Sequence, residues 1–350
     1  MTEPLLSLDG VCTRDATARE HNNRAVLRHV EGDLETASAE YQAALECDPN
    51  NASAHNNFGY LCAQQGRWED AIAHYERSLA LDPEHGMAAA NLGVARAAAG
   101  DVPAGLAALS RAVEINPRNL PAWDNLAKLC MVAGRFGDAE AAWRAALELA
   151  PDDPPLVLAL GTVVAAQQRV DEAVTLLRRA VALDSSAVSA WTQLGVALFM
   201  RHDLGSAGEA LRRALALAPE NLSARHHLSM VLLARGDRDS AVRELDRILL
   251  IDPAYVPARL DLAVHALDAA DYDRALGHLD AGLQADDGNQ RARFYRAVVL
   301  HHVGRSHEAS VLLQSLEAGG TGPYAARARD VLATLSSKQE GAESRDTAVP

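Results

Sequence analysis

The chain has 350 residues, of which 49% are hydrophobic but only 4% are aromatic, and its formal net charge is −14 at pH 7. Alanine and leucine supply most of the apolar side chains, and this composition favours closely packed helices over a sheet core. A surface this acidic repels phosphate backbones, so we expect no general nucleic-acid partner.

The N-terminal residues and the cysteines exclude further classes of protein. Residues 1–10 have neither a basic segment nor an apolar run, so we expect no secretory signal there. No apolar stretch approaches the roughly 18 residues that a membrane span needs. None of the four cysteines belongs to a C-x-x-C pair, which argues against a zinc or redox motif. We therefore expect a cytoplasmic protein with no membrane partner, no metal and no cofactor.

A period of 34 residues organises the chain from residue 18 onward. Proline marks the end of most periods, and Ser185 takes its place once: Pro49, Pro83, Pro117, Pro151, Pro219 and Pro253. A small residue stands 24 positions before each of these marks: Ala25, Gly59, Gly93, Ala127, Gly161, Gly195 and Ser229. A large residue stands eight positions before each: Tyr41, Tyr75, Leu109, Trp143, Leu177, Leu211 and Leu245. No insertion breaks this register.

This pattern resembles the tetratricopeptide repeat (TPR) family across nearly the whole chain. The resemblance implies an all-α fold, a right-handed α-solenoid of about nine helix-turn-helix repeats with a C-terminal capping helix. We place an N-terminal extension at 1–17, nine repeats over 18–323, a capping helix at 324–336 and a disordered tail at 337–350. The repeats are 18–51, 52–85, 86–119, 120–153, 154–187, 188–221, 222–255, 256–289 and 290–323.

Each repeat has positions 1 to 34, with helix A expected at about positions 2–14 and helix B at about 18–31. Glycine often marks the turn between them, as at Gly32 and Gly66, because it tolerates a helix C-terminus. One helix pair cannot bury its own apolar face, so neighbouring repeats must stack. Small residues let paired helices approach, and the large residues fill the space beside them.

The repeats leave 17 residues before them and 27 after them (350 − 323), too few for a catalytic domain. The chain contains neither a G-K-[ST] phosphate loop nor an H-E-x-x-H motif. We therefore predict a protein that is not an enzyme and that binds through the faces of its solenoid.

The family resemblance assigns positions 2, 5, 6, 9, 12 and 13 of helix A to a concave groove. Position 6 holds four asparagines in successive repeats, which are Asn23, Asn57, Asn91 and Asn125. An amide offers both a donor and an acceptor, so such a row can pair with the main chain of an extended peptide. The row is similar to that of the repeat superhelix of O-linked N-acetylglucosamine transferases, although their glycosyltransferase domain is missing. The alternative is that these asparagines only cap and space neighbouring helices.

Other groove positions complete the predicted partner site. In the first half they are Asn22, Asn56, Tyr60, Asp124 and Lys128. In the second half they are Gln193, Phe199, His226, His227, Met230, Asp261, Phe294 and Tyr295. Methionine and phenylalanine there suggest an apolar partner segment such as an amphipathic helix. The alternative is that these apolar side chains pack within the repeats.

Paired histidines such as His226 and His227 invite a metal interpretation, but no carboxylate or cysteine stands at ligand spacing beside them. Asp261, one repeat further along, could pair with His227 instead. We interpret Cys47, Cys62 and Cys130 as small core residues.

The sequence as a whole predicts a non-catalytic scaffold or adaptor whose groove binds a peptide-like segment of a partner protein. Two alternatives use the same groove: a regulatory receptor for a short signalling peptide, and a substrate-delivery subunit of a separate enzyme such as a transferase. Self-association through the end repeats or the convex face stays open.

Overall fold

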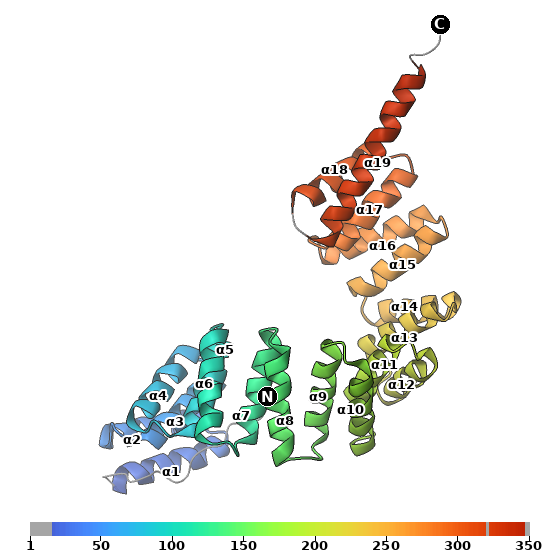
Figure 1. Ribbon diagram of the computed structural model, residues 1–350. Helices are drawn as coiled ribbons and strands as arrows, with labels where there is room; N and C mark the ends of the chain where they lie inside the picture. Colours follow the sequence, from blue (N-terminus) through green and yellow to red (C-terminus); the bar gives the residue numbers. More distant parts are fainter. Residues whose placement is uncertain (1–15, 320–321, 347–350) are drawn as a thin grey trace. The chain divides into compact units, whose positions relative to one another are not determined.

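The computed structural model describes residues 16–319 and 322–346, with side chains from 17 to 319 and from 322 to 334. These residues form α-helices joined by short turns, without any strand (Figure 1). The helices are α1 (Ala16–Val30), α2 (Leu34–Cys47), α3 (Ala52–Gln64), α4 (Trp68–Leu81), α5 (Gly86–Ala98), α6 (Val102–Ile115), α7 (Leu120–Val132), α8 (Phe136–Leu149), α9 (Pro154–Ala166), α10 (Val170–Leu183), α11 (Val188–Met200), α12 (Leu204–Leu217), α13 (Leu222–Ala234), α14 (Arg238–Ile251), α15 (Val256–Asp268), α16 (Tyr272–Ala285), α17 (Gln290–His302), α18 (Ser306–Ala318) and α19 (Pro323–Asp346).

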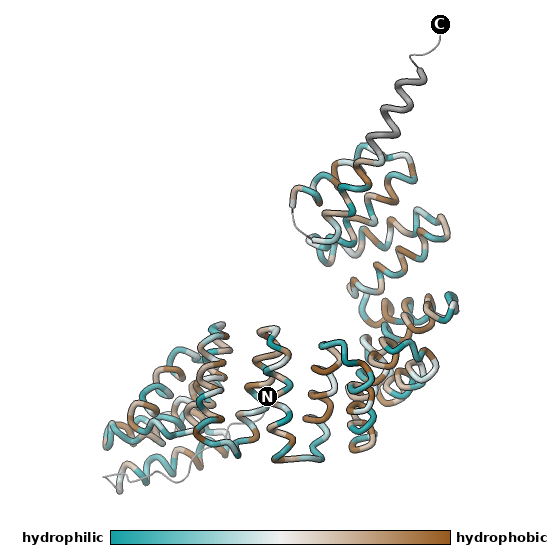
Figure 2. Tube along the Cα trace, viewed as in Figure 1, coloured by the Kyte–Doolittle hydropathy of each residue, from teal (hydrophilic) through white to brown (hydrophobic). Residues whose placement is uncertain are grey.

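The helices pack in consecutive pairs, α1 with α2, α3 with α4 and so on, and α19 packs against α17 and α18. An odd-numbered helix is helix A of its repeat, and the following helix is helix B. In the second repeat, α3 covers positions 1–13 and α4 covers positions 17–30, so each begins one residue earlier than expected. Most helices carry apolar and polar residues on different faces, as amphipathic packing requires, whereas α9 is apolar over most of its length (Figure 2).

Side-chain caps and left-handed turns set where the helices begin and end. The carboxylate of Asp33 accepts the backbone N–H of Thr36 at the start of α2, and the amide oxygen of Asn51 accepts that of Ala54 at the start of α3. Between the helices of a pair, the turn residue has a positive φ, which glycine adopts without strain. Where glycine is missing, another residue takes this conformation: Gln168, His202 and Ala270.

The small and large residues of the repeat meet as expected. A Cβ added to Gly93 would lie 2.5 Å from Cγ of Leu109 and 2.9 Å from the carbonyl oxygen of Gly105. The large residues opposite such positions are fully buried, Tyr75 and Leu109 among them. Glycine at position 8 is therefore what allows helix A and helix B to approach this closely.

A side-chain N–H at position 4 of helix A donates to the carbonyl oxygen that lies six residues earlier, at the proline that ends the preceding repeat. This bond satisfies a main-chain acceptor beyond the end of the preceding helix B. The donor–acceptor pairs are His55 Nε2 with Pro49 (3.1 Å), Trp123 Nε1 with Pro117 (2.9 Å), Arg259 Nε with Pro253 (2.7 Å) and Arg225 Nη2 with Pro219.

The chain divides into two compact units, residues 1–185 and residues 186–350, which we call the first unit and the second unit. The described part of the first unit holds α1 to α10, and that of the second unit holds α11 to α19. None of the described helices is both long enough and apolar enough to cross a lipid bilayer.

The end of the last helix and the burial of Cys47 differ from the expectations, and a third expectation lies outside the described residues. The final helix, α19, extends to Asp346, so the expected tail is helical well past residue 336; Ser336 to Asp346 contain no proline and no other helix stop of comparable strength. Cys47 is exposed rather than in the core, because position 30 lies at the end of helix B; Cys62 and Cys130 are buried as expected. Residues 1–15 of the expected extension lie outside the described residues.

Candidate functional site

The asparagines of the first unit form one hydrogen-bonded chain between helices A, which we call the amide network. Nδ2 of Asn91 donates to Oδ1 of Asn56 (3.1 Å), Nδ2 of Asn56 donates to Oδ1 of Asn57 (3.2 Å), and Nδ2 of Asn57 donates to Oδ1 of Asn22 (3.2 Å). All four side chains are buried. The network thus connects α1, α3 and α5.

Both bonds between helices join residues 35 apart, position 5 of one repeat and position 6 of the next. Asn57 and Asn91 therefore face the neighbouring helix A rather than an open groove. This differs from the expected row of exposed amides, because positions 5 and 6 lie where adjacent A helices meet. Asn57 and Asn91 instead fit the alternative interpretation, in which the asparagines space neighbouring helices. A peptide could pair with these two amides only if the bonds of the network opened.

Asn23 and Asn125, the first and last asparagines at position 6, do not take part in these bonds between helices A. Position 5 of the third repeat is Ala90, so Asn125 faces no amide at the place where Asn57 and Asn91 find one, and its side chain is half-buried. Oδ1 of Asn23 is buried and has no hydrogen-bond partner within the described residues. Asn125, on α7, therefore lies outside the amide network, and its side chain is only half-buried.

A lysine and an apolar residue share this face of α7 with Asn125. Nζ of Lys128 bonds to Oδ2 of the buried Asp124 (2.5 Å), whose Oδ1 accepts from Nε1 of Trp143 (3.0 Å). The side chain of Lys128 is 49% exposed, and Val132, one turn further, is 76% exposed. Asn125, Lys128 and Val132, which we call the α7 surface, follow one another at helical spacing.

Tyr60 does not line an open groove. Its ring stacks on that of the buried His29 at 5.3 Å, and its hydroxyl accepts from Nε2 of Gln64 (2.8 Å). Oε1 of Gln64 in turn lies 2.6 Å from Nε2 of His29, again across 35 residues, at positions 12 and 13. Tyr60 therefore helps to join the first two repeats.

In the second unit, a histidine and an aspartate stand at the positions that the amide network occupies in the first. Nε2 of His226 lies 2.8 Å from Oδ2 of Asp261, and Nη2 of Arg291 lies 2.9 Å from Oδ1 of the same carboxylate. The guanidinium of Arg291 also lies 5.8 Å from the ring centre of Tyr295. We call His226, Asp261 and Arg291 the ionic network. It is His226, and not His227 as expected, that pairs with Asp261, because position 5 faces position 6 of the next repeat.

Burial opposes ionisation of Asp261, but the hydrogen bonds and the charges of His226 and Arg291 outweigh it and hold the pKa of this carboxyl below its usual value. Burial, aided by His226, lowers the pKa of His227. Both effects favour an ionised aspartate beside a neutral His227 at pH 7.

The remaining predicted site residues differ in exposure. Phe294 is buried and packs with Leu300 and Leu313, so it belongs to the core of the last repeat, as the alternative interpretation held. The others are half-buried on helices A: Gln193, Phe199, His227, Met230 and Tyr295. The described residues contain no group of three or more histidine, cysteine or acidic side chains that could hold a metal ion.

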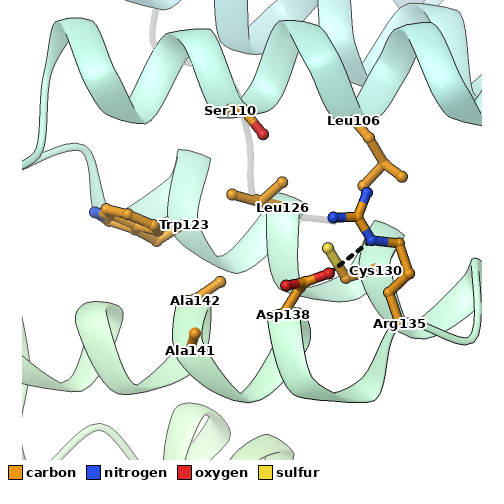
Figure 3. A pocket seen from close by; sticks show the side chains of 9 residues that line it. All are labelled: Leu106, Ser110, Trp123, Leu126, Cys130, Arg135, Asp138, Ala141 and Ala142. Carbon is orange, nitrogen blue, oxygen red and sulfur yellow. Dashed lines mark hydrogen bonds and ion pairs between the residues drawn. The ribbon is translucent and has the colours of Figure 1, made fainter.

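A cavity of about 220 Å³ lies between α6 and the pair α7 and α8 (Figure 3). Its lining residues are Leu106, Ser110, Trp123, Leu126, Cys130, Arg135, Asp138, Ala141 and Ala142. The sequence does not predict it, because adjacent alanines such as Ala141 and Ala142 recur on helices B, as at Ala145 and Ala146. It is smaller than the roughly 300–1,000 Å³ of typical small-molecule sites.

Two family models match the chain. One, described as the cilia and flagella-associated protein 70 C-terminal domain, matches residues 5–245, and the other, described as tetratricopeptide repeat, matches residues 260–323. The chain belongs to the first family, and its repeats are tetratricopeptide repeats. The predicted all-α fold of TPR repeats is thus confirmed.

Solved structures share this TPR fold at low sequence identity. A monomeric mutant of IFIT1 with Gppp-AAAA has a TM-score of 0.57 and 16% identity, covering 94% of this chain and 84% of that one. The hetero-tetramer Cut9-Hcn1 of APC/C has a TM-score of 0.55 and 18% identity, covering 81% of this chain and 56% of that one. PilF of Pseudomonas aeruginosa has a TM-score of 0.50 and 17% identity, covering 59% of this chain and 94% of that one. A search of curated proteins gave no match. These likenesses concern the fold alone.

Proposed function

We propose that this TPR protein is a non-catalytic scaffold or adaptor that binds a peptide-like segment of a partner protein on its helices A. The α7 surface carries the proposal. It places the amide of Asn125 and the aliphatic stem of Lys128 beside Val132, an apolar side chain that is 76% exposed. Polar groups next to exposed apolar area are typical of surfaces that bind other proteins.

Charge supports a protein partner over a nucleic acid. The net charge is −14, and arginines on helices B are paired with carboxylates, as Arg111 is with Glu84 and Arg179 with Asp152. A phosphate backbone would have to displace these carboxylates against the net charge. One structural neighbour is solved with Gppp-AAAA, and another is part of a hetero-tetramer. The charge of this chain favours the second kind of role.

The proposal includes the absence of catalysis, of a cofactor and of a membrane partner, and a place in the cytoplasm, which the unpaired cysteines favour. The half-buried side chains of the second unit, Gln193, Phe199, His227, Met230 and Tyr295, stay in the proposed partner surface, and self-association stays open. A signalling-peptide receptor and a substrate-delivery subunit would use the same helices. A peptide-induced change in small-angle scattering identifies the receptor, and co-purification with an enzyme identifies the delivery subunit.

The test compares Val132→Asp with Val311→Asp, the same change at an exposed valine (52%) on helix B of the last repeat. Both variants and the unmodified chain are used to capture partners from the native host, after circular dichroism has shown equal helix content. We expect Val132→Asp to lose partners that Val311→Asp retains. Equal capture by the two variants contradicts the assignment of the α7 surface.

A further inference from the structure

Position 4 of helix A faces position 23 of helix B within the same repeat, 19 residues along the chain. In two repeats this within-repeat pair joins a base to a carboxylate: Nδ1 of His21 lies 2.6 Å from Oε2 of Glu40, and Nη1 of Arg225 lies 2.6 Å from Oε2 of Glu244. In the fourth repeat a tryptophan faces an alanine, Trp123 and Ala142. The second repeat differs, because its pair consists of two bases, His55 and His74.

The two histidines meet end to end and share one proton. Their Nδ1 atoms are 3.0 Å apart and their ring centres 5.3 Å apart, so each ring directs its Nδ1 at the other. Nε2 of His55 lies 3.1 Å from the carbonyl oxygen of Pro49, which can only accept, so this nitrogen carries the proton of His55. Nδ1 of His55 is then an acceptor, and Nδ1–H of His74 is the donor.

The pair lies in a setting that disfavours charge. Phe58 of α3 packs against the ring of His74, with 4.6 Å between ring centres. Charged groups face the pair from both helices and from the preceding turn. Asp48 and Asp70 attract a proton, whereas Arg67 and Arg77 repel it.

Burial is the largest effect on both histidines: it lowers the pKa of His55 and, with the charge of His55, lowers that of His74 to about 4. Burial also lowers the pKa of His85, whose Nδ1 lies 2.9 Å from Oγ of Ser78.

We propose that the His55–His74 pair makes the second repeat an acid-sensitive switch, in which protonation separates α3 from α4 and opens the amide network. A proton on Nδ1 of His55 removes the acceptor, and protonation of both rings brings two cations end to end. Asn56 and Asn57, the centre of the amide network, lie on α3 directly after His55, so movement of this helix breaks its bonds to α1 and α5. The inference holds whatever the α7 surface binds.

The sign of the effect follows from proton binding. An unfolded histidine titrates near pH 6.5, and the folded His74 titrates near 4, so between these values the open state binds more protons. The closed state is therefore at full stability above about pH 6.5, loses stability down to about pH 4, and loses no more below it. Each titrating histidine favours opening by about tenfold per pH unit in this window.

Hydrogen exchange of the full chain, followed by mass spectrometry and corrected for the intrinsic pH dependence of exchange, tests the proposal. We expect the protection of α3 and α4 to fall by about a hundredfold between pH 6.5 and 4.5, since one histidine gives about tenfold per unit. His74→Glu places a carboxylate opposite His55, as Glu40 stands opposite His21, so that a protonated His55 gains an ion-pair partner. In this variant, protection of α3 and α4 holds or rises as the pH falls to 5.

Two further variants keep the test falsifiable. His74→Gln retains an N–H donor for His55 but leaves only one titrating ring in the pair, so it should reduce the pH dependence even if His74→Glu folds poorly. His278→Glu makes the same change at position 23 of the eighth repeat, where burial also lowers the pKa of the histidine, and should leave α3 and α4 unaffected. Protection of α3 and α4 that does not change with pH in the unmodified chain, or that changes equally in His74→Gln, overturns the proposal.

Discussion

The first unit and the second unit solve the same packing problem with different chemistry. In both, position 5 of one helix A meets position 6 of the next, 35 residues later. The amide network fills these positions in the first unit, and His226 and Asp261 fill them in the second, where Arg291 joins the same carboxylate from position 2. The backbone geometry of stacked repeats therefore fixes where the contact lies and leaves its chemistry to the sequence.

The amide network and the ionic network should lose stability under different solution conditions. Buried amides hold no charge, so salt leaves the amide network unchanged, but a missing partner leaves a buried polar group unsatisfied. The ionic network is partly exposed, with 17% of the His226 side chain and 15% of that of Asp261 accessible. Its contribution therefore depends on the ionisation of Asp261 and on ionic strength.

The largest effect is expected where the amide network is broken. Asn57→Leu keeps the side-chain size but leaves Nδ2 of Asn56 and Oδ1 of Asn22 without partners. We expect the free energy of unfolding of the first unit to fall by about 3 kcal/mol, at about 1–3 kcal/mol for each buried group. Urea unfolding followed by circular dichroism measures it. Asn125→Leu, at the same repeat position outside the network, should change it by less than about 0.5 kcal/mol. Similar losses for both variants would refute the distinction.

A smaller effect is expected for Asp261→Asn in the second unit. The change removes the charge that His226 and Arg291 share, and we expect a loss of about 2 kcal/mol at pH 7, below the value for fully buried pairs because Arg291 is more exposed. The pKa of Asp261 is lowered by folding, so its ionised form stabilises the unit above about pH 4, and this stability is lost as the pH falls through the lowered pKa.

Hydrogen exchange of α13, α15 and α17 at pH 7 and at pH 3 measures this effect. The difference between Asp261→Asn and the unmodified chain should shrink at the lower pH. A difference that stays constant between the two pH values would mean that the carboxylate charge is not what stabilises the unit.

The smallest effect concerns salt. Replacing His226 and Asp261 together by asparagine gives the second unit an amide pair like that of Asn22 and Asn57. In the unmodified chain, we expect 1 M NaCl to lower the protection of α13 and α15 by less than about 1 kcal/mol, because partly exposed ion pairs are weakly screened. The double variant should lack this dependence, and the amide network should show none in either chain. A salt response of α3 and α5 as large as that of α13 and α15 would contradict the comparison.

The period of 34 residues was enough to predict the helix pairs and their packing. The glycine at position 8 and the large residue at position 24 meet as the spacing indicates, since Gly93 and Leu109 leave no room for a Cβ. The capping helix was placed correctly at its start, but its end was not, because the stop signal that proline supplies in most repeats is missing after Leu335.

The candidate site was harder to predict because a family assignment of helix positions does not say which neighbours fill them. Positions 5 and 6 border the next helix A, and whether an asparagine there meets an amide or an alanine depends on another repeat, as Asn91 and Asn125 show. The missing signal is in the sequence: polar residues that complement each other recur 35 apart between repeats and 19 apart within them. His226 with Asp261 and His21 with Glu40 are examples.

The bond from position 4 to the proline carbonyl has a consequence for how such chains tolerate change. An imidazole, an indole and a guanidinium all make it, at His55, Trp123 and Arg259. The contact between repeats requires only a side-chain N–H that can reach the proline carbonyl oxygen. Residues that differ in size, charge and pKa can therefore replace one another at position 4. The fold can therefore stay the same while the side chain at position 4 changes from repeat to repeat. Each contact between repeats can then respond differently to pH or salt.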